Sequence, residues 1–150
     1  MRVRTEMEWL RTLPLFAGVN EAHLQRLSFS ARQARFEPGE ALLTKDNKSR
    51  TAFLVTVGNV EVRDGPDRDS PRAAIIGPGT FIGDLCMIAG IAPRLSAFAV
   101  GVVETKAYSH DLFQRVIEEF PEFGERVVEN LTTRLETSVG ELSQVHPLFL

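Results

Sequence analysis

Two charged side chains, Asp84 and Arg94, stand out in a mostly apolar stretch between residues 81 and 100. The planar fork of an arginine binds a phosphate or a carboxylate at two points. An ionised aspartate only accepts hydrogen bonds, so it suits hydroxyl hydrogens such as those of a sugar. The pair therefore favours one ligand that carries both a phosphate and sugar hydroxyls.

The backbone beside these side chains favours an anion as well. Residues 85–89 are long enough for about one helical turn, and the first N–H groups of a helix have no partners inside it. Gly83 would let this backbone come close to a ligand. We therefore expect the phosphate to meet the start of this turn as well as Arg94.

The same stretch resembles the phosphate-binding cassette of the cyclic nucleotide-binding domain, the sensor module of catabolite-activator-like regulators and of kinase regulatory subunits. The family pattern reads roughly Phe-Gly-Glu-Leu-Ala-Leu, a short spacer and Pro-Arg. Gly83 and Asp84 match its Gly-Glu pair, Leu85 matches its Leu, and Pro93 and Arg94 match its Pro-Arg pair. The resemblance implies that the ligand is cAMP or cGMP.

Three positions depart from the family pattern. Asp84 is one methylene shorter than the family's glutamate, which holds the ribose 2′-hydroxyl. Leu95 replaces a small residue whose N–H or hydroxyl meets the phosphate, and Ser96 is the candidate to take over that contact. Ile82 is inserted between the Phe and the Gly. The residues expected to bind the ligand are Gly83, Asp84, Leu85, Arg94, Leu95 and Ser96.

Two functions fit these residues. The first is a ligand-sensing regulatory domain that binds cAMP or cGMP and transmits binding through its C-terminal helix. The alternative is a degenerate domain that no longer binds nucleotide and acts in protein interaction or dimerisation, because a fold can outlast its ligand. Arg94 favours the first function, whereas Asp84 and Leu95 favour the second.

Composition argues against several other classes of protein. The chain has 150 residues, of which 43% are hydrophobic and 25% charged, as in a single soluble domain. A net charge of −3 and a pI near 5.6 argue against a nucleic-acid surface. Cys86 is the only cysteine, which excludes an internal disulfide and favours the reducing cytoplasm. Neither a signal peptide nor a membrane-spanning segment is visible.

The sequence offers no recognisable set of catalytic or metal-binding residues. His23, His110 and His146 are scattered without metal-ligand spacing, so we expect no metal and no cofactor. Cupin enzymes share a double-sheet barrel in outline, but they need clustered histidines and carboxylates as metal ligands. No Ser/His/Asp or Cys/His signature is present either. We therefore expect that the protein is not an enzyme.

The spacing of apolar and turn residues predicts the elements that position the site. Residues 1–30 carry two short helices, with Asn20 as the N-cap of the second. Residues 31–109 break into short apolar runs separated by Gly, Pro and Asn, which predicts a mainly β fold, a double-sheet jelly roll. The resemblance implies the same barrel. The expected strands are residues 33–36, 41–44, 51–57, 60–63, 73–76, 96–103 and 105–109, with an exposed loop at 65–72.

Residues 110–146 complete this single domain with two helices, the first capped by Ser109 and the second running over about 121–145. The long helix carries a narrow heptad seam that can pack on its own barrel or on a second copy; its members are Val128, Leu131, Leu135, Leu142 and Val145. In the family this helix dimerises and covers the base of the nucleotide. The resemblance thus implies a homodimer, with ligand-facing hydroxyls among Thr132, Thr133, Thr137 and Ser138. Residues 146–150 are too short for the DNA-binding motif that follows this helix in the activator-like regulators.

Overall fold

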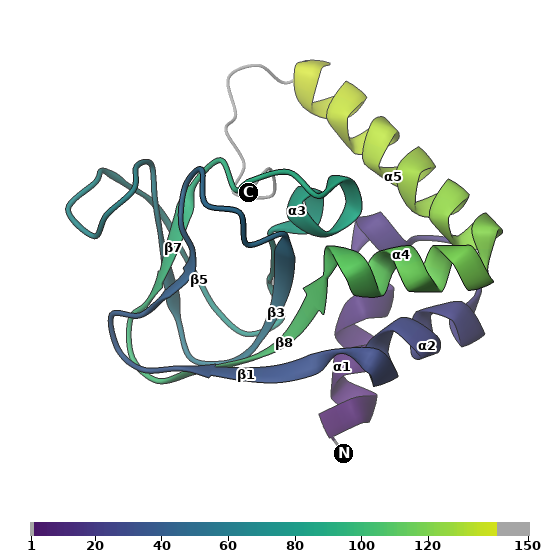
Figure 1. The fold of residues 1–150 in the computed structure, drawn as a ribbon, viewed down its shortest axis with the longest axis horizontal. Helices are drawn as coiled ribbons and strands as arrows, with labels where there is room; N and C mark the ends of the chain where they lie inside the picture. The colour runs from purple at the N-terminus through teal and green to yellow at the C-terminus, as the bar shows by residue number, and fades with distance from the viewer. Residues whose placement is uncertain (1, 141–150) are drawn as a thin grey trace. The chain divides into compact units, whose positions relative to one another are not determined.

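The computed structural model describes the backbone of residues 2–140 and the side chains of residues 6–133. This part of the chain forms two compact units. One unit, the β unit, holds residues 31–111, and the other, the helical unit, combines the chain up to Ser30 with the chain from Leu112 onward. The first boundary, after Ser30, is the one that the sequence predicts, and the second, after Asp111, lies two residues beyond the predicted one (Figure 1).

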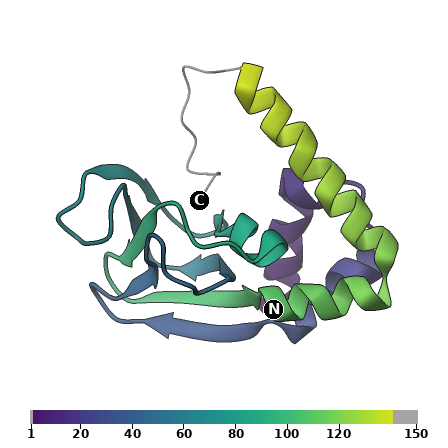
Figure 2. The same cartoon turned by 45° about the horizontal axis from the view of Figure 1, so that its top comes forward.

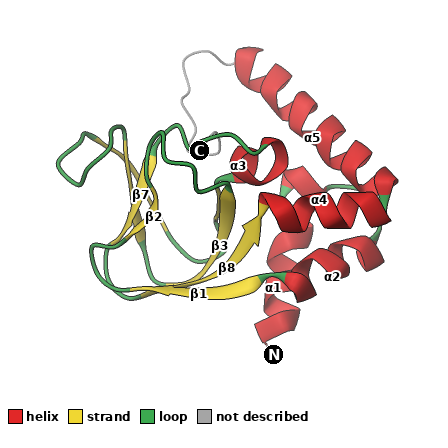
Figure 3. Cartoon of the chain, viewed as in Figure 1, coloured by secondary structure: helices red, strands yellow, loops and turns green. Residues whose placement is uncertain are grey.

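The β unit is a double-sheet jelly roll in which every strand pairing is antiparallel (Figure 3). In strand order, the first sheet consists of β1 (Arg32–Phe36), β8 (Val103–Ser109), β3 (Thr51–Val57) and β6 (Phe81–Ile82). The second sheet consists of β2 (Ala41–Leu43), β7 (Ser96–Ala99), β4 (Val60–Arg63) and β5 (Arg72–Ile76). The predicted fold class is confirmed.

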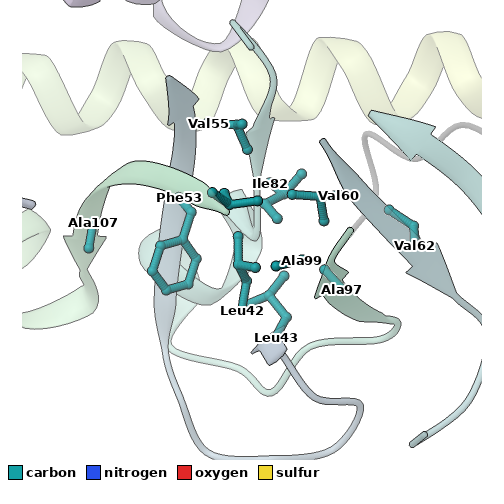
Figure 4. Packing of buried hydrophobic residues seen from close by; sticks show 11 residues of the cluster. Leu42, Leu43, Phe53, Val55, Val60, Val62, Ile82, Ala97, Ala99 and Ala107 are labelled. Atoms are coloured by element: carbon teal, nitrogen blue, oxygen red, sulfur yellow. The ribbon is translucent and has the colours of Figure 1, made fainter. Parts of the chain in front are cut away.

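The core of the jelly roll lies between the two sheets, as expected from alternating strands. Along β4, Val60 and Val62 are fully buried, whereas Glu61 and Arg63, which alternate with them, are only half-buried. Figure 4 shows the resulting cluster of buried side chains; its members are Leu42, Leu43, Phe53, Val55, Val60, Val62, Ile82, Ala97, Ala99, Val103 and Ala107. Both sheets contribute to this cluster, so the core holds them together.

The strand expected over residues 96–103 is wrong in its extent. β7 ends at Ala99, and the next strand starts at Val103. Residues 100–102 turn instead, and the Val100 N–H donates to the Asn59 carbonyl at 3.0 Å. A side chain at Gly58 would lie 2.3 Å from the Val102 carbonyl, so two turns meet backbone to backbone here. The expected strand is therefore interrupted by this contact between turns, although residues 100–102 remain largely apolar.

The helical unit contains the two predicted N-terminal helices and the two that end the described chain. Its elements are α1 (Arg2–Thr12), a 3-10 turn η1 (Pro14–Phe16), α2 (Glu21–Ser30), α4 (His110–Glu119) and α5 (Pro121–Gly140). The first two residues of α4, His110 and Asp111, belong to the β unit. Asn20 caps α2 as predicted, because its side-chain oxygen accepts the Ala22 N–H at 2.8 Å. Figure 2 shows the sharp bend between α4 and α5, which falls at Phe120 and Pro121.

Aromatic contacts fill the core of the helical unit. His23 stacks on Phe120 with 4.1 Å between ring centroids, and Phe123 lies 6.2 Å from the rings of both Phe16 and Phe113. Asn130 of α5 donates to the carbonyl oxygens of Leu15 and Ala17 at 2.9 and 2.8 Å, which ties α5 to the turn η1. Aromatic contacts and the half-buried side-chain amide of Asn130 thus hold the unit together.

The buried face of α5 includes Leu131 of the predicted seam but not Val128. Phe123, Val127 and Leu131 are buried, whereas Val128 is 50% exposed. These residues follow a spacing of four, as in a helix that packs inside its own unit. Of the other predicted seam positions, the side chain of Leu135 is not described, and Leu142 and Val145 lie outside the described residues.

None of the helices within residues 2–140 is both long enough and apolar enough to cross a membrane.

Candidate functional site

The predicted site begins at Gly83, the residue before the short helix α3 (Asp84–Ala89). Gly83 is buried and has a left-handed backbone, with φ at 80°. A Cβ at this position would lie 2.9 Å from the Thr51 carbonyl oxygen and 3.3 Å from the Cα of Ala52. Glycine is therefore needed for two reasons, the positive φ and the close approach of α3 to strand β3.

Asp84 is the first residue of α3, and its side chain turns inward. The residue is 3% exposed, and its Oδ1 accepts the backbone N–H of Leu85 at 2.8 Å. A carboxylate in the first turn of a helix is stabilised by the unpaired N–H groups and the helix dipole. One of the N–H groups that the sequence analysis offered to a phosphate is therefore bonded to Asp84.

Cys86 lies in the middle of α3 and is 1% exposed. Burial raises the pKa of its thiol to about 11, and the negative charge of Asp84 adds to this effect. A thiol with this pKa stays protonated and unreactive at neutral pH. Cys86 therefore acts as a small apolar side chain inside the cassette.

The other end of α3 is held by a residue that the sequence analysis did not place in the site, His110. Its Nδ1 lies 2.7 Å from the Met87 carbonyl oxygen. Because a carbonyl only accepts, Nδ1 carries the hydrogen. The ring packs against Gly90, where an added Cβ would lie 3.0 Å from Nε2. No local pattern points to this contact, because its partners are 23 residues apart.

Arg94 follows α3 after a short linker, and its side chain is exposed. Within residues 6–133 its guanidinium has no hydrogen-bond or ion-pair partner. The preceding residue, Pro93, is buried, and its carbonyl accepts the Asp46 N–H at 3.0 Å. The backbone below Arg94 is thus fixed while its charge faces solvent, which leaves all its N–H donors available to an anion.

Leu95 and Ser96 both point into the protein. Leu95 is half-buried and packs against the core cluster of the jelly roll. Ser96 is fully buried; its hydroxyl donates to the Gly65 carbonyl at 2.5 Å and accepts the Lys45 N–H at 2.9 Å. The single hydroxyl hydrogen of Ser96 is therefore engaged with the loop between β4 and β5. The loop predicted at residues 65–72 is confirmed except at its two ends, since Arg72 already belongs to β5 and Gly65 is buried.

The loop between β2 and β3, residues 44–50, lies beside this segment and has an unusual backbone. Asp46 and Arg50 have positive φ values of 66° and 50°, which are uncommon for residues with a side chain. The Arg50 carbonyl accepts the His110 N–H at 2.9 Å. The loop therefore contacts both the segment before Arg94 and the start of α4.

The structure brings the predicted site residues together in two groups. Gly83, Asp84 and Leu85 start α3, and Arg94, Leu95 and Ser96 lead into β7. Both groups are anchored in the same core, because Ile82 and Leu95 belong to or pack against one cluster. Among the described residues, no group of three or more His, Cys, Asp or Glu side chains could hold a metal ion.

The jelly roll, the short helix behind a left-handed glycine and the exposed arginine after it define a ligand-binding module of the cyclic nucleotide-binding class. The family model described as "Cyclic nucleotide-binding domain" matches residues 33–120, more than half of the chain. The chain therefore belongs to this family. The resemblance inferred from the cassette residues is confirmed.

Solved structures share the fold. The N-terminal domain of a transcriptional regulator from Streptomyces coelicolor A3(2) is 24% identical, with a TM-score of 0.77 and coverage of 92% of this chain and 96% of that one. Thermus thermophilus Catabolite Activator Protein is 22% identical, with a TM-score of 0.67 over 87% of this chain and 62% of that one. The cAMP-bound PfPKA-R is 14% identical, with a TM-score of 0.68 over 76% of this chain and 41% of that one.

Proposed function

We propose that the protein is a regulatory domain that binds a cyclic nucleotide, cAMP or cGMP, and transmits binding through α5. The observation that carries this proposal is the exposed, unpartnered Arg94 side chain on a fixed backbone within the described residues. Membership in the family supports it, as does a shared fold with the cAMP-bound PfPKA-R. The role is regulatory rather than catalytic, and the proposed location is the cytoplasm, where the lone Cys86 stays reduced.

Arg94 would bind two oxygens of the cyclic phosphate through its planar fork. Gly83 and Leu85 would place the start of α3 on the other side of the ligand. Leu95 and Ser96 point into the protein and would hold the backbone next to Arg94 in place. The Pro93 carbonyl accepts the Asp46 N–H and the Ser96 hydroxyl accepts the Lys45 N–H, so the segment that carries Arg94 is ordered before a ligand arrives. Such preorganisation reduces the entropy that binding must remove.

Transmission requires that the ligand binds one state of the protein better than another. The hydrogen bond between His110 and Met87 joins the last turn of α3 to the first residue of α4. A change in α3 on binding would therefore reach α4, and α5 follows α4 after Phe120. We propose that this link makes the position of α5 depend on the ligand.

A second copy of the chain is the proposed partner of α5. Val128 is 50% exposed on this helix, and an apolar side chain on a long helix favours pairing with another helix. Thr132 does not offer its hydroxyl hydrogen to a ligand, because it donates to the Val128 carbonyl at 2.9 Å. Sedimentation equilibrium of the whole chain tests the dimer; a monomer at all concentrations would refute it.

Isothermal titration with cAMP and with cGMP tests the function, using protein freed of carried-over ligand. We expect micromolar or tighter binding of at least one nucleotide. Arg94→Ala should weaken it about 100-fold, because two charge-assisted hydrogen bonds are lost. Its unfolding midpoint should not change, since the side chain is exposed. Arg115→Ala, another exposed arginine, is the matched control and should bind normally.

The outcomes separate the two functions that fit the sequence. Absence of binding to wild-type protein would favour the degenerate domain that acts through contacts with other proteins. Binding that survives Arg94→Ala unchanged would show that a different group holds the phosphate.

A further inference from the structure

We propose that the β2–β3 loop, residues 44–50, forms a second wall of the phosphate site, in which Arg50 binds the phosphate of the ligand together with Arg94. This inference rests on the proposed function and adds a binding residue to it. The sequence analysis placed no binding residue in this loop. The contacts of the loop, the backbone of Arg50 and the charge of the loop carry the inference.

One end of the loop is bonded to the segment that carries Arg94. The Asp46 N–H donates to the Pro93 carbonyl at 3.0 Å, and the Lys45 N–H donates to the Ser96 hydroxyl at 2.9 Å. Along the chain, these two acceptors lie on either side of Arg94. The start of the loop is therefore fixed directly beside the backbone from which the exposed guanidinium extends.

The other end of the loop, at Arg50, adjoins the start of α3. The next residue is Thr51, whose carbonyl oxygen would lie 2.9 Å from a Cβ added at Gly83, so the backbone here packs against the glycine that precedes α3. The loop thus contacts both groups of site residues, the one that starts α3 and the one that leads into β7. Arg50 therefore lies next to a ligand that bridges the two groups.

The backbone of Arg50 is strained. Its φ of 50° lies in the left-handed region, which is unfavourable for a residue with a side chain. The hydrogen bond from the His110 N–H to the Arg50 carbonyl, at 2.9 Å, holds this conformation in place. Residues held in such conformations are concentrated at ligand-binding sites. The guanidinium of Arg50, like that of Arg94, thus extends from a backbone that is fixed before a ligand arrives.

The loop also concentrates positive charge on an acidic chain. All of its charged side chains except Asp46 are basic, whereas the whole chain has a net charge of −3. Lys48, Arg50 and Arg94 are exposed, and none of them has an ion-pair partner within residues 6–133. Neighbouring cations without acidic partners attract an anion, which relieves their mutual repulsion when it binds.

Titration of the wild type and of Arg50→Ala with cAMP and cGMP tests the role of Arg50. At low salt we expect the variant to bind about tenfold more weakly, because one charge-assisted hydrogen bond is lost. Arg50→Lys keeps the charge without the planar fork, so it should recover part of the affinity. The matched control is Arg32→Ala, an exposed arginine on β1, which β8 separates from β3 in the sheet. This control should bind as the wild type does.

Salt separates a phosphate contact from a structural role of Arg50. The loss of affinity in Arg50→Ala should become smaller as the ionic strength rises from about 0.01 to about 0.15 M, because the Debye length falls from about 30 to about 8 Å. Without ligand, the variant should unfold at the wild-type midpoint, since it keeps the same Cβ and loses only exposed atoms. A loss of affinity that does not depend on salt, together with a lowered midpoint, would overturn the inference.

Inorganic phosphate provides a test that does not depend on the nucleotide. An anion that binds the native state raises the unfolding midpoint, so phosphate should raise the midpoint of the wild type more than that of Arg50→Ala or of Arg94→Ala. The double variant measures the general effect of phosphate on folding.

The outcomes distinguish the inference from the proposed function. Stabilisation by phosphate that needs both arginines, without binding of either nucleotide, would refute the proposed function and support the two-arginine anion site. Nucleotide binding that Arg50→Ala leaves unchanged would overturn the inference and leave the proposed function intact. Equal effects of phosphate on all variants, without nucleotide binding, would overturn both.

Discussion

The imidazole of His110 holds the last turn of α3, with Nδ1 2.7 Å from the Met87 carbonyl oxygen. Because His110 is also the first residue of α4, one side chain joins the cassette helix to the C-terminal helices. Its own N–H is bonded to the Arg50 carbonyl at 2.9 Å, which adds the β2–β3 loop to the same junction. Loop, cassette and α4 therefore meet at one residue.

Replacement of His110 by alanine should loosen α3 at its C-terminal end. The Met87 carbonyl loses its partner, so we expect a loss of about 1 kcal/mol in the free energy of unfolding. Hydrogen exchange should become faster at the Gly90 amide, which bonds to the Cys86 carbonyl at 3.1 Å. Urea unfolding and amide exchange measure the two effects. Arg115→Ala is the control, and an unchanged exchange rate at Gly90 would contradict the assigned contact.

Gly83→Ala should be among the most damaging alanine substitutions in the cassette. A side chain is strained at a φ of 80°, and the new Cβ would approach the Thr51 carbonyl to 2.9 Å. We expect a loss of about 2 kcal/mol or more in unfolding free energy. Gly101→Ala is the matched control, because nothing lies within 4 Å of its added Cβ; it should change stability by about 0.5 kcal/mol or less. Similar midpoints for both variants in urea would refute the packing argument.

Much of the fold could be predicted from local sequence because turn residues and strand alternation coincide. β3 and β4 have the predicted bounds, and Gly58 and Asn59 separate them. The short strand β6 was not predicted, because two residues carry no periodic pattern. It forms through a non-local pairing of Ile82 with Phe53. Strand β7 ended early for the same kind of reason, a contact between turns distant in sequence.

Adjacent apolar residues in α5 explain why the sequence pattern predicted the wrong buried valine. Val127 and Val128 are neighbours on the chain but lie about 100° apart around a helix. A heptad frame selects Val128, whereas packing with Phe123 and Leu131 at intervals of four selects Val127. Only the contacts of α5 inside its unit, such as that of Asn130 with Leu15, decide between the two faces.

Residue types in the site could be predicted, but the directions of their side chains could not. Gly83 and Arg94 follow from spacing and chemistry. The hydroxyl of Ser96, by contrast, is oriented by Lys45 and Gly65, which are distant in sequence. The carboxylate of Asp84 could face solvent or accept the Leu85 N–H, and the packing around α3 determines that it does the second. Side-chain direction depends on the folded surroundings, which a linear pattern does not contain.

Glu61 on β4 should make stability depend on pH in the acidic range. Its side chain is 2.6 Å from Arg63 and 3.1 Å from Arg72. The hydrogen bond from Arg63 is the main cause that holds its pKa below the ordinary value of 4.5. A carboxyl with a lowered pKa contributes stability above its unfolded pKa, and this contribution is lost as pH falls through the folded value.

The measurement is urea unfolding of wild type and Glu61→Gln across pH. Near neutral pH the wild type should be the more stable protein. The gap should begin to shrink as pH falls below 4.5, where Glu61 of the unfolded chain takes up a proton first, and should disappear once pH has also fallen through the lowered pKa of the folded protein. Asp69→Asn, whose residue lies exposed in the β4–β5 loop, controls for general charge effects. A gap that stays constant at all pH values would show that the arginine contacts do not matter.

Cys86 should resist thiol reagents as long as the protein is folded. Its pKa is raised to about 11, first by burial and then by the charge of Asp84, so few molecules carry the reactive thiolate near pH 8. Burial at 1% exposure also blocks access. We expect an aromatic disulfide reagent to label native protein slowly and unfolded protein at once, with one thiol per chain. Asp84→Asn removes only the second cause and should leave native labelling slow, whereas rapid labelling of native wild type would mean that α3 opens to solvent.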